Sequence, residues 1–181
     1  MEKLNIEQLH KLRLSIFDNA ESLYKEAKLL YANTMYARAY LLAYFACEEL
    51  GKISIIVGAI GKLIQGEEVD WKKVGKRFRS HKEKVISENY HHYVFGIELE
   101  LINDSDIKWL DEQNTKSHSK VENKNRSTYV DILNGKILLP QEQVSQEDAK
   151  EMIEIAFKCL SAHWQSESLT NPIVIAANKA N

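Results

Sequence analysis

The chain has few residues that interrupt regular backbone structure. Its 181 residues include two prolines and seven glycines, fewer than the many turns of a β-sandwich or β-barrel require. Long helices are therefore expected. The two cysteines, Cys47 and Cys159, lie far apart in apolar periodic segments. This argues against a disulfide framework or a thiolate metal site and favours two buried free thiols in a reducing cytosol.

Signatures of the common enzyme classes are also absent. The sequence contains no glycine-rich phosphate loop, no Cys-x-x-Cys pair and no nucleophile elbow, and its first residues form no apolar signal-peptide core. His91 and His92 are adjacent and cannot face one ion from a regular helix, while His10, His118 and His163 lack ligand-like neighbours. We expect no metal, no cofactor and a cytoplasmic location.

The most apolar segment, Met35–Ile60, is about long enough to cross a bilayer. It contains Arg38, Glu48, Glu49 and Lys52, and each charge near the middle of a span costs about 2.5–3.5 kcal/mol. We therefore interpret the segment as the central buried helix of a bundle. No membrane partner is expected.

Apolar residues at helical spacing predict several helices in a single domain over residues 1–170, followed by a loose tail at 171–181. Asn33 and Thr34 are expected to cap the second helix and Asp70 the third. The segment Tyr90–Leu101 is compatible with either continued helix or irregular packing. The expected helices are Ile6–Leu30, from Asn33–Thr34 to about Gln65, from Trp71 onward, Ser105–Lys120, and from Ser145 onward, the last with Ala149, Met152, Ile153, Ala156, Phe157 and Leu160 on one face.

One segment has the texture of strands. Asn134-Gly135 separates two apolar runs, Ser127–Leu133 and Lys136–Leu139, which is a strong hairpin signal. Because an isolated two-stranded hairpin is marginally stable, we expect it to lie against the helices. The predicted fold class is all-α, with a small β-hairpin near residues 127–139.

The formal net charge of −2 conceals a basic segment. Between Trp71 and Lys84 there are seven lysines and arginines against one glutamate, and a weaker basic stretch lies near Lys124 and Arg126. Such a surface attracts phosphates through a largely sequence-independent field. A solvated helix face has the same composition, so both interpretations stay open.

Two side chains fall on faces that the apolar pattern assigns to the core. Glu49 shares a helical face with apolar residues, where an ionised carboxylate needs a partner or a raised pKa; a local Glu48–Lys52 pair would account for Glu48 alone. His81 follows Arg77 by four residues and precedes Lys84 by three. An imidazole between cations can move a proton beside a bound phosphate and cleave RNA without metal. The alternative is a hydrogen-bonded core histidine.

Three motifs in this order resemble the AbiV-type abortive infection proteins, a bacterial phage-defence family related to the HEPN helical domains. The resemblance covers roughly Thr34 to Phe157 and rests on Ala46-Cys47-Glu48-Glu49-Leu50-Gly51-Lys52, Phe78-Arg79-Ser80-His81-Lys82-Glu83-Lys84 and Lys124-Asn125-Arg126-Ser127-Thr128-Tyr129-Val130-Asp131. It implies an antiparallel HEPN-like helical bundle that forms a homodimer, with the active groups of both protomers meeting in a cleft at the interface. The HEPN nuclease signature places more residues between its arginine and histidine than the three that separate Arg77 from His81.

The resulting hypothesis is a phage-defence protein that binds RNA or cleaves it without metal, and that responds to a phage-encoded activator protein. The catalytic candidates are His81, Arg77 and Glu49. The RNA- or phosphate-binding candidates are Lys52, Arg79, Lys84, Arg126, Tyr129 and Asp131. The main alternative is a non-enzymatic module that binds a phage or host protein, and nucleotide binding without cleavage is a third interpretation.

Overall fold

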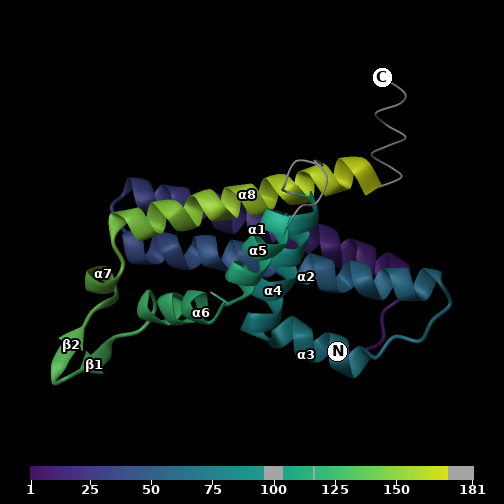
Figure 1. Ribbon diagram of the computed structural model, residues 1–181, viewed down its shortest axis with the longest axis horizontal. Helices are drawn as coiled ribbons and strands as arrows, with labels where there is room; N and C mark the ends of the chain where they lie inside the picture. Colours follow the sequence, from purple (N-terminus) through teal and green to yellow (C-terminus); the bar gives the residue numbers. More distant parts are fainter. Residues whose placement is uncertain (96–103, 116, 171–181) are drawn as a thin grey trace.

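The computed structural model describes residues 1–95, 104–115 and 117–170 (Figure 1). Within these residues the chain forms eight helices and one two-stranded antiparallel sheet. The predicted all-α class with a small hairpin is confirmed. The expected tail at 171–181 and the second half of the Tyr90–Leu101 segment lie outside the described residues.

Three long helices make the body of the bundle: α1 (Ile6–Ala32), α2 (Tyr36–Ile64) and α8 (Gln146–Thr170). Helix α1 runs antiparallel to both α2 and α8 (Figure 1). Fifteen of the 29 residues of α2 are buried, and this helix contacts most of the other elements. The prediction of a central buried helix is therefore confirmed. No helix in the described part of the chain combines the length and hydropathy of a bilayer span.

The ends of the helices are held by local side-chain contacts. The Asp70 carboxylate accepts a hydrogen bond from the Lys73 amide at 2.9 Å, so the predicted cap of α3 is confirmed. The predicted cap of α2 is wrong. Asn33 ends α1 and donates its side-chain amide to the Leu29 carbonyl, and Thr34 turns the chain with φ 60. The start of α2 has no side-chain cap.

The third helix is interrupted at Ser80, where the sequence predicts a continuous apolar stripe through His81. Helix α3 (Trp71–Arg79) ends before Ser80, whose backbone is extended with ψ 117, and α4 (His81–Phe95) begins after it. The Ser80 hydroxyl accepts a hydrogen bond from the Glu83 amide at 3.3 Å, so this serine caps the new helix. Arg77 and His81 consequently do not share one helical face.

Helix α4 packs against α2 and α8, while α5 (Asp104–Thr115) and α6 (Ser117–Arg126) pack against α4. The helix predicted over Ser105–Lys120 thus corresponds to α5 and the first part of α6, with residue 116 outside the described residues. At the start of α8, Ser145 and Asp148 form a capping box through reciprocal hydrogen bonds, so the helix begins where the sequence predicts. The sequence predicts Phe157 on the buried face of α8, and this prediction is wrong. Phe157 is 56% exposed and packs at the surface against Tyr24.

The hairpin consists of β1 (Asp131–Leu133) and β2 (Lys136–Leu138), followed by the short helix α7 (Pro140–Gln143). Asn134 and Gly135 both have positive φ, of 52 and 77, as a tight two-residue turn requires. The expectation that the strands lie against the helices is wrong, because the hairpin projects from one end of the bundle (Figure 1). Ile132 and Ile137 face each other across the strands and are 69% and 61% exposed.

Candidate functional site

The site is centred on Glu48, a buried carboxylate of α2 that faces the first turn of α4. Only 3% of the residue is exposed. Its Oε1 lies 2.5 Å from Nδ1 of His81, and its Oε2 accepts a hydrogen bond from Nζ of Lys84 at 2.6 Å. One carboxylate therefore binds two side chains from a single helical turn. A buried carboxylate is tolerated where a cation and hydrogen bonds compensate its lost hydration.

Glu48, and not Glu49, is the carboxylate that contacts His81. Glu49 is only half-buried and pairs with Lys52 one turn along the same helix. The alternative of a local Glu48–Lys52 pair is wrong, because Lys52 pairs with Glu49 and Glu48 with Lys84. The apolar pattern placed the wrong one of two neighbouring glutamates in the core because α2 is buried nearly all round, so that helical spacing does not single out one inner face.

Gly51 brings α4 close to this carboxylate. A Cβ atom at this position would collide with the backbone carbonyl of Lys84. The missing side chain lets the turn that contains His81 and Lys84 pack directly against the backbone of α2. A glycine inside a helical pattern is the sequence signal for such a close approach, and here it lies three residues after Glu48.

Lys52 ties the end of α3 to the same region of α2. Its Nζ lies 5.2 Å from the centre of the Phe78 ring, a favourable cation–π distance, and it also contacts Glu49. The sequence makes Lys52 a candidate contact for RNA phosphate. In this structure its ammonium group is already held by an aromatic ring and a carboxylate.

His81 is the open member of the network. Its side chain is 47% exposed, whereas that of Glu48 is 4% exposed. Within the part of the chain that the structure describes, Nε2 of His81 has no hydrogen-bond partner. In the tautomer that donates from Nδ1 to Glu48, Nε2 carries a lone pair directed away from the carboxylate. This arrangement of base and orienting carboxylate can accept a proton from a bound substrate.

Two tyrosines extend the polar face of α2 from Glu48 towards α6. Burial raises the pKa of the Tyr44 hydroxyl, and the adjacent Glu48 carboxylate raises it further. Burial likewise raises the pKa of Tyr40 to about 12, although a hydrogen bond with Asn123 acts in the opposite direction. Both hydroxyls stay protonated at neutral pH and can only act as neutral donors or acceptors.

The predicted catalytic arginine, Arg77, lies over α4. Its Nη2 donates to the Ser87 hydroxyl at 3.1 Å, and its Nε lies 3.4 Å from a Glu83 carboxylate oxygen. Lys84, a predicted phosphate contact, is buried, and its ammonium group is bound to Glu48 in the single chain. The exposed cations near the junction of α3 and α4 are Lys72, Lys73, Lys76, Arg79 and Lys82.

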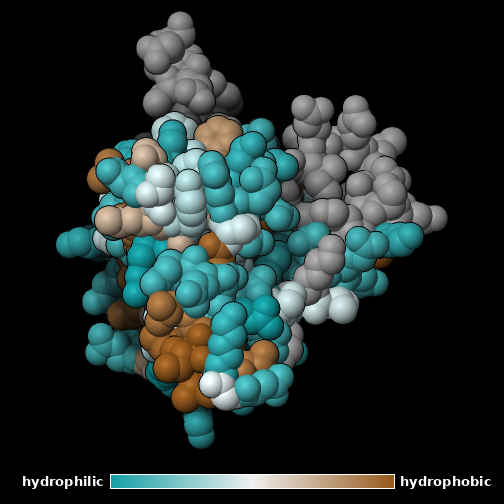
Figure 2. All heavy atoms as spheres, turned by 90° about the vertical axis from the view of Figure 1, so that its left-hand side faces the viewer, coloured by the Kyte–Doolittle hydropathy of each residue, from teal (hydrophilic) through white to brown (hydrophobic). Residues whose placement is uncertain are grey.

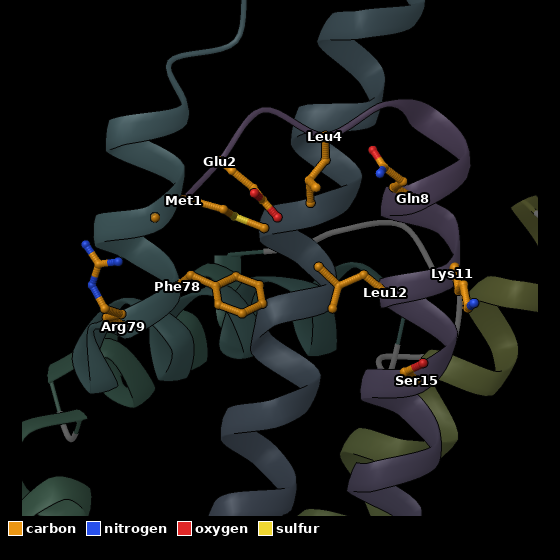
Figure 3. A pocket seen from close by; sticks show the side chains of 10 residues that line it. Met1, Glu2, Leu4, Gln8, Lys11, Leu12, Ser15, Phe78 and Arg79 are labelled. Atoms are coloured by element: carbon orange, nitrogen blue, oxygen red, sulfur yellow. The ribbon is translucent and has the colours of Figure 1, made fainter.

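Arg79 lies beside a separate pocket between α3 and the N-terminal segment. This pocket has a volume of about 540 Å³ and a largely apolar lining. In Figure 3, Phe78 points towards Leu12 inside the pocket, whereas the guanidinium group of Arg79 points away from that ring. The charge of Arg79 thus belongs to the basic surface and not to the pocket interior.

The remaining predicted phosphate contacts lie away from His81 in the single chain. Arg126 lines a polar pocket of about 250 Å³ with Tyr40, and Tyr40 is eight residues from Glu48, or about 12 Å along the helix axis. Tyr129 and Asp131 are exposed at the start of the hairpin. The structure therefore brings Glu48, His81 and Lys84 together but not Arg126, Tyr129 and Asp131.

A second group of titratable side chains, which the sequence pattern missed, lies further along α4. Glu88 and His91 meet His163 of α8, with one possible ligand atom of each within 4.8 Å of the others. No sequence spacing could reveal this group, because His163 comes from a distant helix. The one local signal was the placement of Glu88 and His91 three residues apart.

Comparisons with known proteins address the family of the chain. Residues 8–161 match the family model HEPN_AbiV, described as AbiV. The match includes all three motifs on which the resemblance rests and extends it into α1. No curated protein and no solved structure matches the chain.

Proposed function

Because the chain belongs to the AbiV family of HEPN proteins, we propose that it acts in abortive infection against phage and that its His81 site cleaves RNA. The observation that carries the proposal is the exposed imidazole of His81, oriented by the buried carboxylate of Glu48 at 2.5 Å. Exposed lysines and Arg79 surround the junction that presents this imidazole. Their field favours a polyphosphate ligand.

In the proposed reaction, Nε2 of His81 takes the proton from a ribose 2′-hydroxyl. The 2′-oxygen attacks the neighbouring phosphorus, the bond to the 5′-oxygen breaks, and the leaving oxygen takes a proton from water. The products are a 2′,3′-cyclic phosphate and a free 5′-hydroxyl. Glu48 holds the imidazole in the required tautomer and stabilises the imidazolium that forms, while the cations balance the developing charge on the phosphate.

We further propose that the active form is a homodimer. In a single chain, Arg126 and the hairpin residues lie away from His81, and a second copy can supply groups that one chain does not bring together. The apolar surface of the projecting hairpin supports self-association. Its exposed members are Tyr129, Val130, Ile132, Leu133 and Ile137.

The test is RNA cleavage in excess EDTA, followed by identification of the product ends. We expect cyclic phosphate ends from wild type, loss of cleavage in His81→Gln, and a reduced rate with an altered pH profile in Glu48→Gln. Glu49→Gln is the matched control, because this neighbouring carboxylate does not contact His81, and its rate should stay near that of wild type. Circular dichroism under the same conditions checks that each variant is folded.

The assay is run with and without extract of phage-infected cells, so that a missing activator does not mask the activity. No cleavage in either case by folded wild type would contradict the nuclease proposal. So would cleavage that His81→Gln leaves unchanged.

The projecting apolar hairpin favours a second candidate function, a non-enzymatic module that binds a phage or host protein. Exposed apolar patches of this kind mark protein-binding surfaces. This alternative predicts that phage protection survives in His81→Gln and is lost in Ile132→Lys. The nuclease proposal predicts loss of protection in His81→Gln, with the fold retained.

A further inference from the structure

The group formed by Glu88, His91 and His163 is well enclosed by the bundle. Glu88 and His163 are buried, and His91 is half-buried at the edge of the group. Glu88 and His91 lie one turn apart on α4, so their side chains share a face, and His163 approaches from α8. The group is separate from the His81 site, since neither His81 nor Glu48 contributes to it.

The three side chains already contact one another. Nε2 of His163 lies 2.9 Å from Oε2 of Glu88. The imidazole rings of His91 and His163 are stacked, with centroids 3.6 Å apart and an angle of 5° between their planes. Nε2 of His91 lies 3.2 Å from the Ser166 hydroxyl. Two imidazoles and a carboxylate thus converge on one small volume between α4 and α8.

The surroundings of His163 favour its neutral form. Burial, and to a smaller extent the nearby positive charge of Arg13, lower the pKa of His163 to about 3. The imidazole is therefore neutral at physiological pH, which is the form that binds metal ions. Arg13 forms an ion pair with Glu167, so its charge is balanced next to the group.

We propose that Glu88, His91 and His163 bind a divalent transition-metal ion, with Zn²⁺ as the natural probe. Two imidazole nitrogens and one carboxylate oxygen are a common ligand set for Zn²⁺, and a fourth position completes the tetrahedron. The ion takes the place of the hydrogen bond between His163 and Glu88, and the single proton of the neutral His163 ring then lies on Nδ1. The stacked rings tilt so that both lone pairs point at the ion.

A thiol lies next to this position. Cys159 precedes His163 by one turn of α8, and its pKa is raised by contacts with Cys47 and Glu88 and by burial. The Cys159 thiol therefore lies close to Glu88, the carboxylate that we assign to the metal.

The bound ion would link α4 to α8 and stabilise the bundle, independently of RNA cleavage.

The experiment measures Zn²⁺ binding by calorimetry on the full chain after removal of metal with a chelator. We expect one Zn²⁺ per chain and a rise in melting temperature on binding. His91→Gln should weaken binding at least about tenfold, and because His91 is only half-buried this variant is the one best able to fold. His163→Gln should have the same effect. His10→Gln changes a histidine outside the group and should bind as wild type does.

Absence of saturable binding by folded, metal-free wild type would overturn the proposal. Binding that both His91→Gln and His163→Gln leave unchanged would overturn it as well, because the ion would then occupy another place. Neither result depends on cleavage of RNA, so the metal proposal and the nuclease proposal fail separately.

Discussion

At the residue scale, the buried carboxylate of Glu48 contacts two side chains of α4, Lys84 and His81. This carboxylate neutralises the buried ammonium group of Lys84 and orients the exposed imidazole of His81. The contact with Lys84 stabilises the fold, and the contact with His81 presents a base to solvent. Loss of Lys84 would therefore leave a carboxylate in the interior without its main compensating charge, which proteins tolerate poorly.

We predict that Lys84→Met lowers the free energy of unfolding by about 3 kcal/mol, the lower end of the range for breaking a buried ion pair. Lys52→Met removes a partly buried pair within one helix and a cation–π contact, and should lower the free energy of unfolding by about 1 kcal/mol. Urea denaturation of both variants measures the difference. Equal losses in the free energy of unfolding would contradict the prediction, because burial would then add nothing to the contribution of the Glu48–Lys84 pair.

The raised pKa of Tyr40 predicts a loss of stability in alkali. The unfolded chain releases the proton near pH 10 and the folded chain near pH 12, so between these values the folded state binds more protons. The contribution of Tyr40 to the free energy of unfolding is therefore fully present below pH 10. It is lost as the pH rises from 10 to 12, by at most about 1.4 kcal/mol per pH unit. Tyr40→Phe should make the decline shallower in urea denaturation at pH 10 to 12. Parallel curves for variant and wild type would contradict this assignment.

At the scale of elements, the separation of α2 and α4 is set by a single glycine. We predict that Gly51→Ala destabilises the protein by about 1–3 kcal/mol, because the new methyl group forces the two backbones apart. Gly58 lies in the same helix with no neighbour in the way. Gly58→Ala should therefore stabilise the protein by up to about 1 kcal/mol through helix propensity. Thermal denaturation of both variants shows whether each melting temperature rises or falls relative to wild type. A Gly51→Ala variant as stable as wild type would contradict the close packing of α2 and α4.

The elements also show how far local sequence rules reach. The long helices, the Asp70 cap and the hairpin turn follow from apolar spacing and from residues with strong local preferences. The interruption at Ser80 does not follow, because apolar residues keep the same spacing on both sides while one serine hydroxyl ends the pattern. The choice between Glu48 and Glu49 likewise depends on which side of α2 faces α4, and this is a property of tertiary packing.

At the scale of the whole molecule, the sequence could not place the contacts between distant segments. Neither His91 nor His163 has ligand-like spacing in the sequence, yet their rings stack across α4 and α8. The outward projection of the hairpin was missed for a related reason. An apolar segment is expected to be buried against other protein, but its composition does not say whether that protein is the same chain or another one.

We predict that the hairpin holds two copies of the chain together. Its apolar side chains gather at the lower part of the face shown in Figure 2, and the paired Ile132 and Ile137 are at their centre. Changing both to lysine should convert a dimer to a monomer in analytical ultracentrifugation while circular dichroism stays unchanged. The control variant Lys136→Gln changes a polar residue next to Ile137 on β2 and should remain dimeric. A dimer that survives the double substitution would place the interface elsewhere.

The central position of α2 also has a consequence for the lifetime of the site. Because this helix is enclosed by α1, α8 and α4, its amides around Glu48 can reach solvent only when the bundle opens as a unit. Hydrogen–deuterium exchange of these amides should therefore be as slow as global unfolding, while those of the hairpin exchange early. The group that orients His81 is thus as persistent as the folded protein, even though the imidazole itself is open to solvent.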